Sequence, residues 1–436
     1  MGRLIELIDE TEKAFLFGID IRRDKRELWS AQDSLRELEL LAKTAGLRVS
    51  GQDIQKRPAP DPTTYMGEGK LKDVKEKMDG LETRVLVIDD ELTPAQQRNI
   101  ENGFPMDYKI VDRTTLILDI FAQHARSREG KLQVELAQNQ YRLPRLTRLW
   151  THLIRQAGGR SGGIKGGVGL RGPGETQIES DRRQMRRRIS VLKHQIEEIR
   201  LHRKQHRRQR KRQGIPVITL VGYTNAGKSS LLKALSSADV MIKDQLFATL
   251  DPTTRRVHLP GGKEVLFTDT VGFINKLPLD LVAAFRATLE EITESDLILH
   301  LVDMTHPKSE AQTAVVEKTL GDLGVGKDRI LTVWNKSDKI DGSGGRENNG
   351  TRISALTGDG IDSLLHRIET LLHQSMRPVE ILLPYTAGNL LNEIHNKGSV
   401  EVEEHKAEGT YLRAYLPASL ANRLDIYRIR GSVTQP

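Results

Sequence analysis

The first third of the chain alternates between short apolar runs and amphipathic stretches. Apolar runs at residues 14–19, 84–88 and 109–111 have the length of buried strands, and stretches at 31–45, 69–78 and 94–102 have helical spacing. Thr93 immediately precedes the last of these helices as an N-cap residue. Because strands that alternate with helices are typical of parallel sheets, we expect residues 1–125 to form an N-terminal α/β domain.

Two polar features of this region resemble ligand sites only loosely. Residues 66–70 (MGEGK) share glycines and a lysine with phosphate-binding loops, but no strand precedes them, so an ordinary loop is expected. Asp89, Asp90 and Glu91 follow a strand, where a divalent cation could bind, and a solvated loop is the preferred interpretation.

The pattern then becomes helical. Residues 114–155 carry apolar positions at helical spacing with a break near Pro144, and residues 175–212 form a second helical stretch. Its apolar residues lie three, four and seven positions apart: Ile178, Met185, Ile189, Leu192, Ile196 and Ile199. This spacing predicts a helix that packs against another helix. We therefore expect residues 126–213 to form an antiparallel helical hairpin, connected by a glycine-rich loop at 158–174.

The remainder of the chain predicts two further α/β units. Apolar runs at 217–221, 266–268, 298–302 and 330–334 predict the strands of a doubly wound parallel sheet within residues 214–375. Residues 376–436 predict a small C-terminal α/β domain, with a strand at 379–383, a helix at 388–396 and a hairpin formed by 399–403 and 410–415. The expected fold class is therefore a multidomain α/β protein.

Composition narrows the class of protein further. A chain of 436 residues is too long for a single core, and 37% hydrophobic with 29% charged residues suits a soluble protein. No apolar run reaches about 18 residues and the N-terminus lacks a signal-peptide core, so a cytoplasmic protein without a membrane span is expected, as a monomer. The absence of cysteine excludes disulfides, thiolate metal sites and cysteine nucleophiles.

The net charge of +8 is concentrated in the predicted hairpin. The basic residues of its second helix are Arg182, Arg183, Arg186, Arg187, Arg188, Arg203, Lys204, Arg207, Arg208, Arg210, Lys211 and Arg212. A solvated charged face is one interpretation, but repulsion among so many like charges favours nucleic acid as a partner. No aromatic residue interleaves them, which favours recognition of backbone and shape over base stacking.

The glycine-rich loop is also cationic, through Arg160, Lys165 and Arg171. A flexible linker is one interpretation, although two paired helices need only a few connecting residues. A long basic glycine loop at the tip of a rigid hairpin is better suited to entering a folded RNA.

A phosphate-binding loop follows the strand at 217–221. Residues 222–229 (GYTNAGKS) have the spacing G-x-x-x-x-G-K-S and precede a helix-like segment. Gly222 and Gly227 allow the tight turn that points backbone N–H groups at phosphate. Lys228 can reach the β- and γ-phosphates, and the Ser229 hydroxyl suits Mg²⁺. A simple strand-to-helix turn would need neither the lysine nor the serine.

Further motifs follow in the order expected of a nucleotide hydrolase. In the polar segment 245–254, Thr249 could bind Mg²⁺ and sense the γ-phosphate, with Thr253 and Thr254 as alternatives. A strand then delivers Asp269, which could hold the ion through water, and Gly272, whose N–H could reach the γ-phosphate.

The last two motifs concern the base. Asp338, in the sequence Asn335-Lys336-Ser337-Asp338, can accept two hydrogen bonds from guanine that adenine cannot donate. Ser354-Ala355-Leu356 is expected to close the base pocket.

Together, GYTNAGKS, DTVG, NKSD and SAL resemble a GTPase of the translation-factor class. GLRGPGETQ and FATLDPTTR resemble the HflX family of ribosome-associated GTPases, over roughly residues 10–370. The resemblance implies GTP hydrolysis coupled to binding of the large ribosomal subunit and splitting of stalled or idle ribosomes. It also implies that the hairpin loop reaches rRNA near the peptidyl-transferase region.

The resemblance also assigns site residues. Lys228, Thr249 and Gly272 would act in catalysis, and Ser229 and Thr249 would bind Mg²⁺. The residues implied to contact GTP are Gly222, Tyr223, Thr224, Asn225, Ala226, Gly227, Lys228, Ser229, Phe247, Ala248, Thr249, Leu250, Asp251, Asp269, Thr270, Val271, Gly272, Asn335, Lys336, Ser337, Asp338, Ser354, Ala355 and Leu356.

Phe273 stands where many GTPases have a glutamine that orients the attacking water, so slow intrinsic hydrolysis is expected. Activation would then come from an RNA or protein group on the ribosome, with Asn225 helping to hold a K⁺ ion at the phosphates. Alternatives are a ribosome-assembly or RNA-modification GTPase, an ATP-using RNA-remodelling protein, and a nucleotide-sensing RNA-binding protein without useful turnover.

Overall fold

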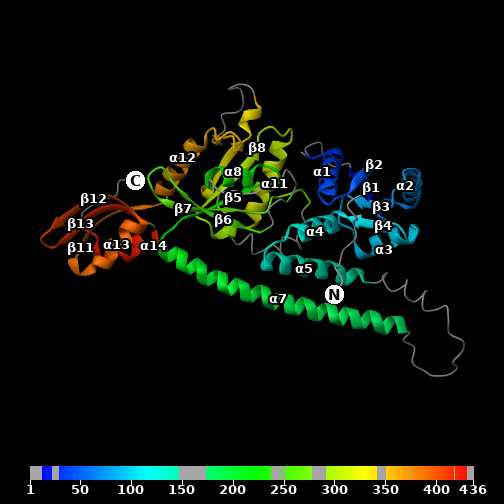
Figure 1. The fold of residues 1–436 in the computed structure, drawn as a ribbon, viewed down its shortest axis with the longest axis horizontal. Coiled ribbons are helices and arrows are strands. Elements are labelled where there is room, and N and C mark those ends of the chain that lie inside the picture. Colours follow the sequence, from blue (N-terminus) through cyan, green and yellow to red (C-terminus); the bar gives the residue numbers. More distant parts are fainter. Residues whose placement is uncertain are drawn as a thin grey trace.

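The computed structural model describes residues 12–21, 29–146, 173–236, 247, 251–276, 291–340, 350–374, 376–416 and 418–429. Figure 1 shows three sheet-containing units, with one long helix running along the central and N-terminal units. The expectation of a multidomain α/β fold is confirmed.

The N-terminal sheet has the strand order β2-β1-β3-β4, and its neighbouring strands are parallel. The strands are β1 (Lys13–Ile21), β2 (Arg48–Arg57), β3 (Val85–Ile88) and β4 (Lys109–Asp112). The sequence did not predict β2, because this edge strand (RVSGQDIQKR) is mostly polar and only partly buried.

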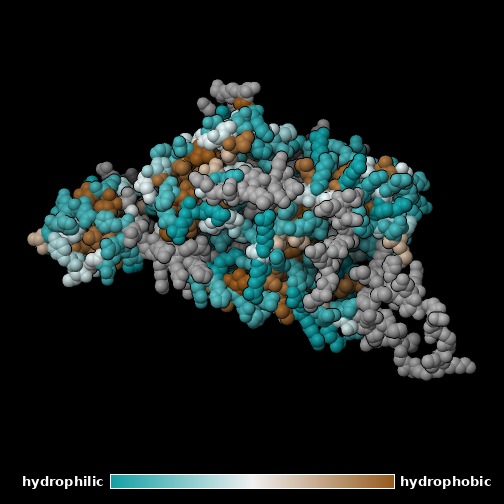
Figure 2. All heavy atoms as spheres, in the orientation of Figure 1, coloured by the Kyte–Doolittle hydropathy of each residue, from teal (hydrophilic) through white to brown (hydrophobic). Residues whose placement is uncertain are grey.

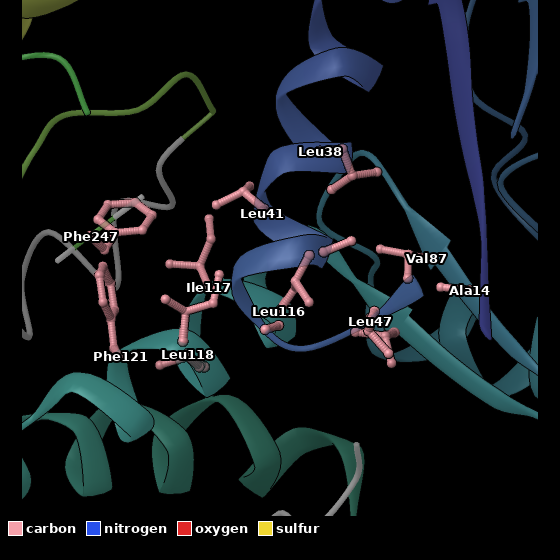
Figure 3. Close-up of a cluster of buried hydrophobic side chains, with 14 of the residues drawn as sticks. Ala14, Leu38, Leu41, Leu47, Val87, Leu116, Ile117, Leu118, Phe121 and Phe247 are labelled. Carbon is pink, nitrogen blue, oxygen red and sulfur yellow. The ribbon is translucent and has the colours of Figure 1, made fainter. Parts of the chain in front are cut away.

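Helices pack on both faces of this sheet. They are α1 (Ala31–Thr44), α2 (Glu68–Gly80), α3 (Pro94–Gly103) and α4 (Arg113–His124). On one face, side chains of α1 and α4 such as Leu38 and Leu116 pack against Val87 of β3 (Figure 3). On the other face, Met78 of α2 and Ile100 of α3 belong to a second buried cluster. The N-terminal domain is therefore a three-layer α/β sandwich.

The helical region contains α5 (Arg128–Arg142), a short 3-10 helix η1 (Leu143–Arg145) and α7 (Pro173–Gln213). The helical stretch predicted from residue 114 is interrupted between α4 and α5, where Ser127 caps α5. Glu135 of α5 pairs with Arg188 of α7 at 2.6 Å, and Glu129 pairs with Arg203. These pairings confirm an antiparallel arrangement of the two helices. Most of the predicted glycine-rich loop, residues 158–172, lies outside the described residues.

The central sheet, which we call the G-domain sheet, has the order β10-β9-β8-β5-β7-β6. All neighbouring strands are parallel except β6 and β7. The strands are β5 (Val217–Gly222), β6 (Thr253–His258), β7 (Glu264–Asp269), β8 (Leu297–Asp303), β9 (Ile330–Asn335) and β10 (Thr351–Arg352). The accompanying helices include α8 (Lys228–Ser236), α11 (Ser309–Asp322) and α12 (Ile361–Gln374). The sequence did not predict β6, whose residues TTRRVH are polar and partly exposed.

The C-terminal unit is a three-stranded antiparallel sheet with two helices. Its strands are β11 (Arg377–Leu383), β12 (Ser399–Lys406) and β13 (Gly409–Leu416), in the order β11-β13-β12. The predicted hairpin is confirmed as β12 and β13, and the predicted helix as α13 (Gly388–Lys397). The sequence did not predict the short α14 (Ala418–Arg423).

The face of the molecule in Figure 2 is largely hydrophilic, with separated hydrophobic patches. Within the described ranges, no helix is both long enough and apolar enough to cross a bilayer.

A buried cluster of charged side chains joins the N-terminal domain to the G domain. Arg113, only 1% exposed at the start of α4, donates to Asp89 at 2.7 Å and to Glu37 of α1. Lys276 of the G domain donates to Asp89 at 2.6 Å and pairs with Asp90 at 2.6 Å. The solvated-loop interpretation is therefore wrong for Asp89, which is 2% exposed and forms ion pairs with Arg113 and Lys276. Among the described residues, no three His, Cys, Asp or Glu side chains are grouped so that they could hold a metal ion.

Replacing Arg113 tests the strength of this cluster. Arg113→Gln leaves Glu37 and Asp89 buried without their main counter-charge, so the free energy of unfolding should fall by about 3 kcal/mol or more. The urea midpoint of the full chain measures the effect. Arg84→Gln is the control, because Arg84 forms its ion pairs with Asp79 and Asp107 at the surface and its loss should shift the midpoint far less. Equal shifts in both variants would contradict a stabilising role for the buried cluster.

Candidate nucleotide-binding site

The phosphate loop connects the end of β5 to the start of α8. A Cβ on Gly222 would lie 2.4 Å from the Leu301 carbonyl oxygen, and a Cβ on Gly227 would lie 2.1 Å from the Asn335 side chain. Gly227 also has a φ of +94°. Both positions therefore require glycine, which explains why the loop can turn tightly between a strand and a helix.

Lys228 and Ser229 are placed at the N-terminus of α8. The Lys228 ammonium donates to the carbonyl oxygens of Gly222 at 3.1 Å and Tyr223 at 2.9 Å. Burial lowers the pKa of Lys228 to about 8, and the nearby Asp269 carboxylate opposes that shift. The Lys228 ammonium group therefore lies within the phosphate loop and is unusually acidic.

Ser229, a predicted Mg²⁺ ligand at the start of α8, lies beside Asp269, which is predicted to hold the ion through water, at the end of β7. Ser229 donates its hydroxyl to Asp269 at 2.7 Å. A hydroxyl and a carboxylate are hard oxygen donors, which fit Mg²⁺. Thr270, next in the chain, is buried and donates to the Leu220 carbonyl at 2.7 Å, so its side chain holds β5 rather than a ligand.

The segment after Asp269 pairs with the phosphate loop. Phe273 donates its N–H to the Gly222 carbonyl at 3.0 Å and accepts the Thr224 N–H at 2.8 Å. A Cβ on Gly272 would lie 2.9 Å from Thr224 and 3.1 Å from the Lys228 Nζ, so only glycine fits this close approach. The Phe273 ring is buried in an apolar cluster that includes Val221 and Tyr223.

The base-recognition motifs are held by hydrogen bonds across the sheet. Asn335 donates to the Ala226 carbonyl at 2.8 Å and accepts the Ala355 N–H at 3.0 Å. Ser354 donates its hydroxyl to Asp338 at 2.6 Å. The phosphate loop, the NKSD motif and the SAL motif therefore form one connected site, as the sequence predicts.

The remaining residues of the two base motifs have individual environments. Lys336 has a φ of +67° and donates to Asp303 at 2.6 Å. Asp303 was not predicted as a site residue, although it ends β8, the strand beside the one that leads into the NKSD motif. Leu356 is 80% exposed, and Ser337 begins a short 3-10 helix.

Two described residues near Thr249, Phe247 and Asp251, have side chains that contact helices. Phe247 is buried against Phe121 of α4, with ring centroids 4.7 Å apart (Figure 3). Asp251 accepts the backbone N–H groups of Arg126 at 2.9 Å and Ser127 at 2.6 Å, and so helps to cap α5. The side chains of Phe247 and Asp251 thus face the helices, and their contact with GTP stays a prediction. Ala248, Thr249 and Leu250 lie outside the described residues.

Three more residues from the predicted list have defined environments. Asn225 is exposed with a φ of +62°, at the outer turn of the phosphate loop. Val271 packs at the edge of the N-terminal core. Tyr223 is 4% exposed and points into the N-terminal domain.

A phosphate loop, a D-x-x-G segment bonded to it and a guanine-specific NKSD motif, all at the carboxyl end of one sheet, define a GTPase. Three family models match the chain: a GTP-binding GTPase N-terminal region at residues 32–122, a GTP-binding GTPase middle region at 124–210 and a 50S ribosome-binding GTPase at 217–336. The chain belongs to the HflX GTPase family, and the protein is a GTP-hydrolysing enzyme.

Similar proteins cover nearly the whole chain. The GTPase HflX of Lacrimispora saccharolytica is 43% identical and matches 98% of this chain and 100% of its own length. The GTPase HflX of Escherichia coli is 39% identical, with 93% and 94% covered. Among solved structures, a GTP-binding protein from Sulfolobus solfataricus in complex with GDP is 25% identical over 83% of this chain and 99% of that chain, with a TM-score of 0.41.

Asp338→Asn should exchange the base specificity. Because the Ser354 hydroxyl holds Oδ1, the asparagine would keep its carbonyl oxygen there and turn its amide N–H₂ toward the base. That group repels the guanine donors and can donate to the 2-oxo group of xanthine. We expect GTP affinity to fall roughly 100-fold and affinity for xanthosine triphosphate to rise, as measured by nucleotide titration. Unchanged preference for GTP would contradict this assignment of the base pocket.

Nucleotide affinity should depend on pH through Lys228. The free enzyme holds the pKa of Lys228 near 8, and bound phosphate favours the protonated form, so binding takes up a proton once the pH exceeds 8. GDP affinity should therefore be about fourfold weaker at pH 8.5 than at pH 7.0. Calorimetry in two buffers of different ionisation enthalpy measures the proton uptake directly. Constant affinity without proton uptake would show that Lys228 stays protonated throughout.

Proposed function

We propose that this GTPase binds the large ribosomal subunit and uses GTP binding and hydrolysis to split stalled or idle ribosomes. Its glycine-rich loop at 158–174 would enter rRNA near the peptidyl-transferase region. The curated relatives and the family description of a 50S ribosome-binding GTPase support a ribosomal partner. The proposal includes a cytoplasmic location and a monomeric protein.

The basic surface of α7 is the observation that carries the proposal. This helix has 41 residues, which correspond to about 60 Å. Arg188 and Arg203 form ion pairs with glutamates of α5. The remaining exposed cations of the helix include Arg183, Arg186, Arg187, Lys193 and Lys204. A rigid helix anchored by two arginines and displaying the others is suited to an rRNA surface.

The site residues divide the hydrolysis between them. Lys228 and the loop N–H groups neutralise and orient the phosphates, and the Gly272 N–H is the donor for the γ-phosphate. Ser229 and Asp269 would hold Mg²⁺, which when bound neutralises developing charge on the phosphate oxygens. Because Phe273 is apolar and buried, the chain offers no water-orienting group there, and an activating group from the ribosome would complete the site.

Splitting can be followed by light scattering of purified ribosomes. Mixing with GTP-bound protein should lower the scattering, and a protein whose residues 158–174 are replaced by a short Gly-Ser linker should bind subunits but not split them. Arg186→Glu should weaken binding several-fold and reduce the salt dependence, because one phosphate contact is lost. Arg98→Glu, an exposed change on α3, is the charge-matched control. Normal splitting by the linker variant would contradict the role of the loop. Stable binding without splitting by the unaltered protein would favour a ribosome-assembly GTPase.

We further propose that Asn225 helps to hold a K⁺ ion beside the phosphates. Its exposed position in the phosphate loop allows the amide oxygen to reach such an ion. GTP hydrolysis should then be several-fold faster in K⁺ than in Na⁺, and Asn225→Ala should remove the difference. Equal rates in the two salts would contradict the proposal.

A further inference from the structure

Tyr223 belongs to the phosphate loop by sequence, but its side chain is bound by the N-terminal domain. Its ring stacks on Trp29, with centroids 6.0 Å apart and planes inclined by 26°. Its hydroxyl donates to the Glu37 carboxylate on α1. Burial raises the pKa of Tyr223, so the phenol remains protonated and able to donate. The N-terminal domain therefore holds one residue of the nucleotide loop directly.

The same hydroxyl also holds the segment that follows D-x-x-G. It accepts the Asn275 N–H at 2.7 Å. Arg113 donates to the Asn275 carbonyl at 3.1 Å and to the second oxygen of Glu37. Both the N–H and the carbonyl of residue 275 are thus held by side chains that meet at Glu37.

Asn275 lies three residues after Gly272, the predicted γ-phosphate donor. The intervening Phe273 is paired with the backbone of Gly222 and Thr224 on both its N–H and its carbonyl. With Asn275 held from outside the sheet and Phe273 held by the phosphate loop, the peptide carrying Gly272 is fixed on its C-terminal side at two points. One of these two points depends on the N-terminal domain.

We propose that Glu37 is a positioning residue for GTP hydrolysis: through Tyr223 and Arg113 it fixes the peptide after D-x-x-G, and so places the Gly272 N–H for the γ-phosphate. A carboxylate is required because one oxygen accepts from Tyr223 and the other from Arg113. A glutamine would present an N–H₂ group to one of these two donors. This role concerns the GTPase reaction itself and does not depend on the ribosomal partner.

Single-turnover GTP hydrolysis by the full chain tests the proposal. Glu37→Gln and Tyr223→Phe should each lower kcat about tenfold, the scale of one lost hydrogen bond in the reacting state, with the KM for GTP and the Kd for GDP within about twofold of the unaltered protein. Because the two residues act through one chain of hydrogen bonds, the double variant should be no slower than either single variant. Hydrogen exchange of the Asn275 amide should be faster in Tyr223→Phe.

Tyr108→Phe is the matched control. Tyr108 is also a buried tyrosine whose hydroxyl donates to a carboxylate, that of Asp79, but it lies in the N-terminal domain outside the contacts of Glu37. Its kcat should remain unchanged. An unchanged or raised kcat in Glu37→Gln and Tyr223→Phe would overturn the proposal. Multiplying losses in the double variant would also overturn it, as would an equal loss of kcat in Tyr108→Phe.

Discussion

The structure depends on a buried charge cluster between two domains that the sequence presents as separate. Burial of the charged Arg113 guanidinium costs a large free energy unless carboxylates surround it. Glu37 and Asp89 supply these carboxylates. Lys276 adds a cation from the G domain. Separating the domains would leave these charges with fewer partners, so the N-terminal domain and the GTP site form one connected unit.

In this arrangement, the phosphate loop contacts side chains of the N-terminal domain. The backbone of the loop is hydrogen-bonded to the segment after D-x-x-G, while the side chain of Tyr223 connects both to α1. Elsewhere, Asp251, two residues before β6, accepts the N–H of Ser127, the residue that caps α5. A Cβ on Gly130 would lie 2.3 Å from the Asp251 carboxylate, so a glycine on α5 makes room for that contact. The G domain therefore contacts the N-terminal domain through Tyr223 and the helical region through Asp251.

Much of this organisation could be predicted from local sequence. The apolar runs of β1, β3 and β4 are typical of buried parallel strands, and the spacing of the phosphate loop, D-x-x-G and NKSD motifs identifies the chain as a GTPase. The edge strands β2 and β6 were not predicted, because their residues are mostly polar. Edge strands bury few side chains, so they lack a strong hydrophobic pattern.

Contacts between distant segments could not be predicted from local patterns either. Tyr223 and Glu37 are 186 positions apart, and Asp251 and Ser127 are 124 positions apart, so neither pairing leaves a signal in a short window. Asp89 looked solvated because three acidic residues in a row usually face water, and only the fold shows the buried arginine beside it. The family resemblance correctly named the GTPase, but it carries no side-chain directions, so it did not predict that Phe247 and Asp251 contact the helices.

We expect the buried cluster to couple the GTP site energetically to the N-terminal domain. Native-state hydrogen exchange of the full chain, with and without saturating GDP, measures this coupling. GDP binds in the G domain, yet coupling should slow the exchange of the α1 and α4 amides, Ala31–Thr44 and Arg113–His124, when GDP is bound. Protection confined to β5, α8, β7 and β9 would show that the GTP site and the N-terminal domain are not coupled.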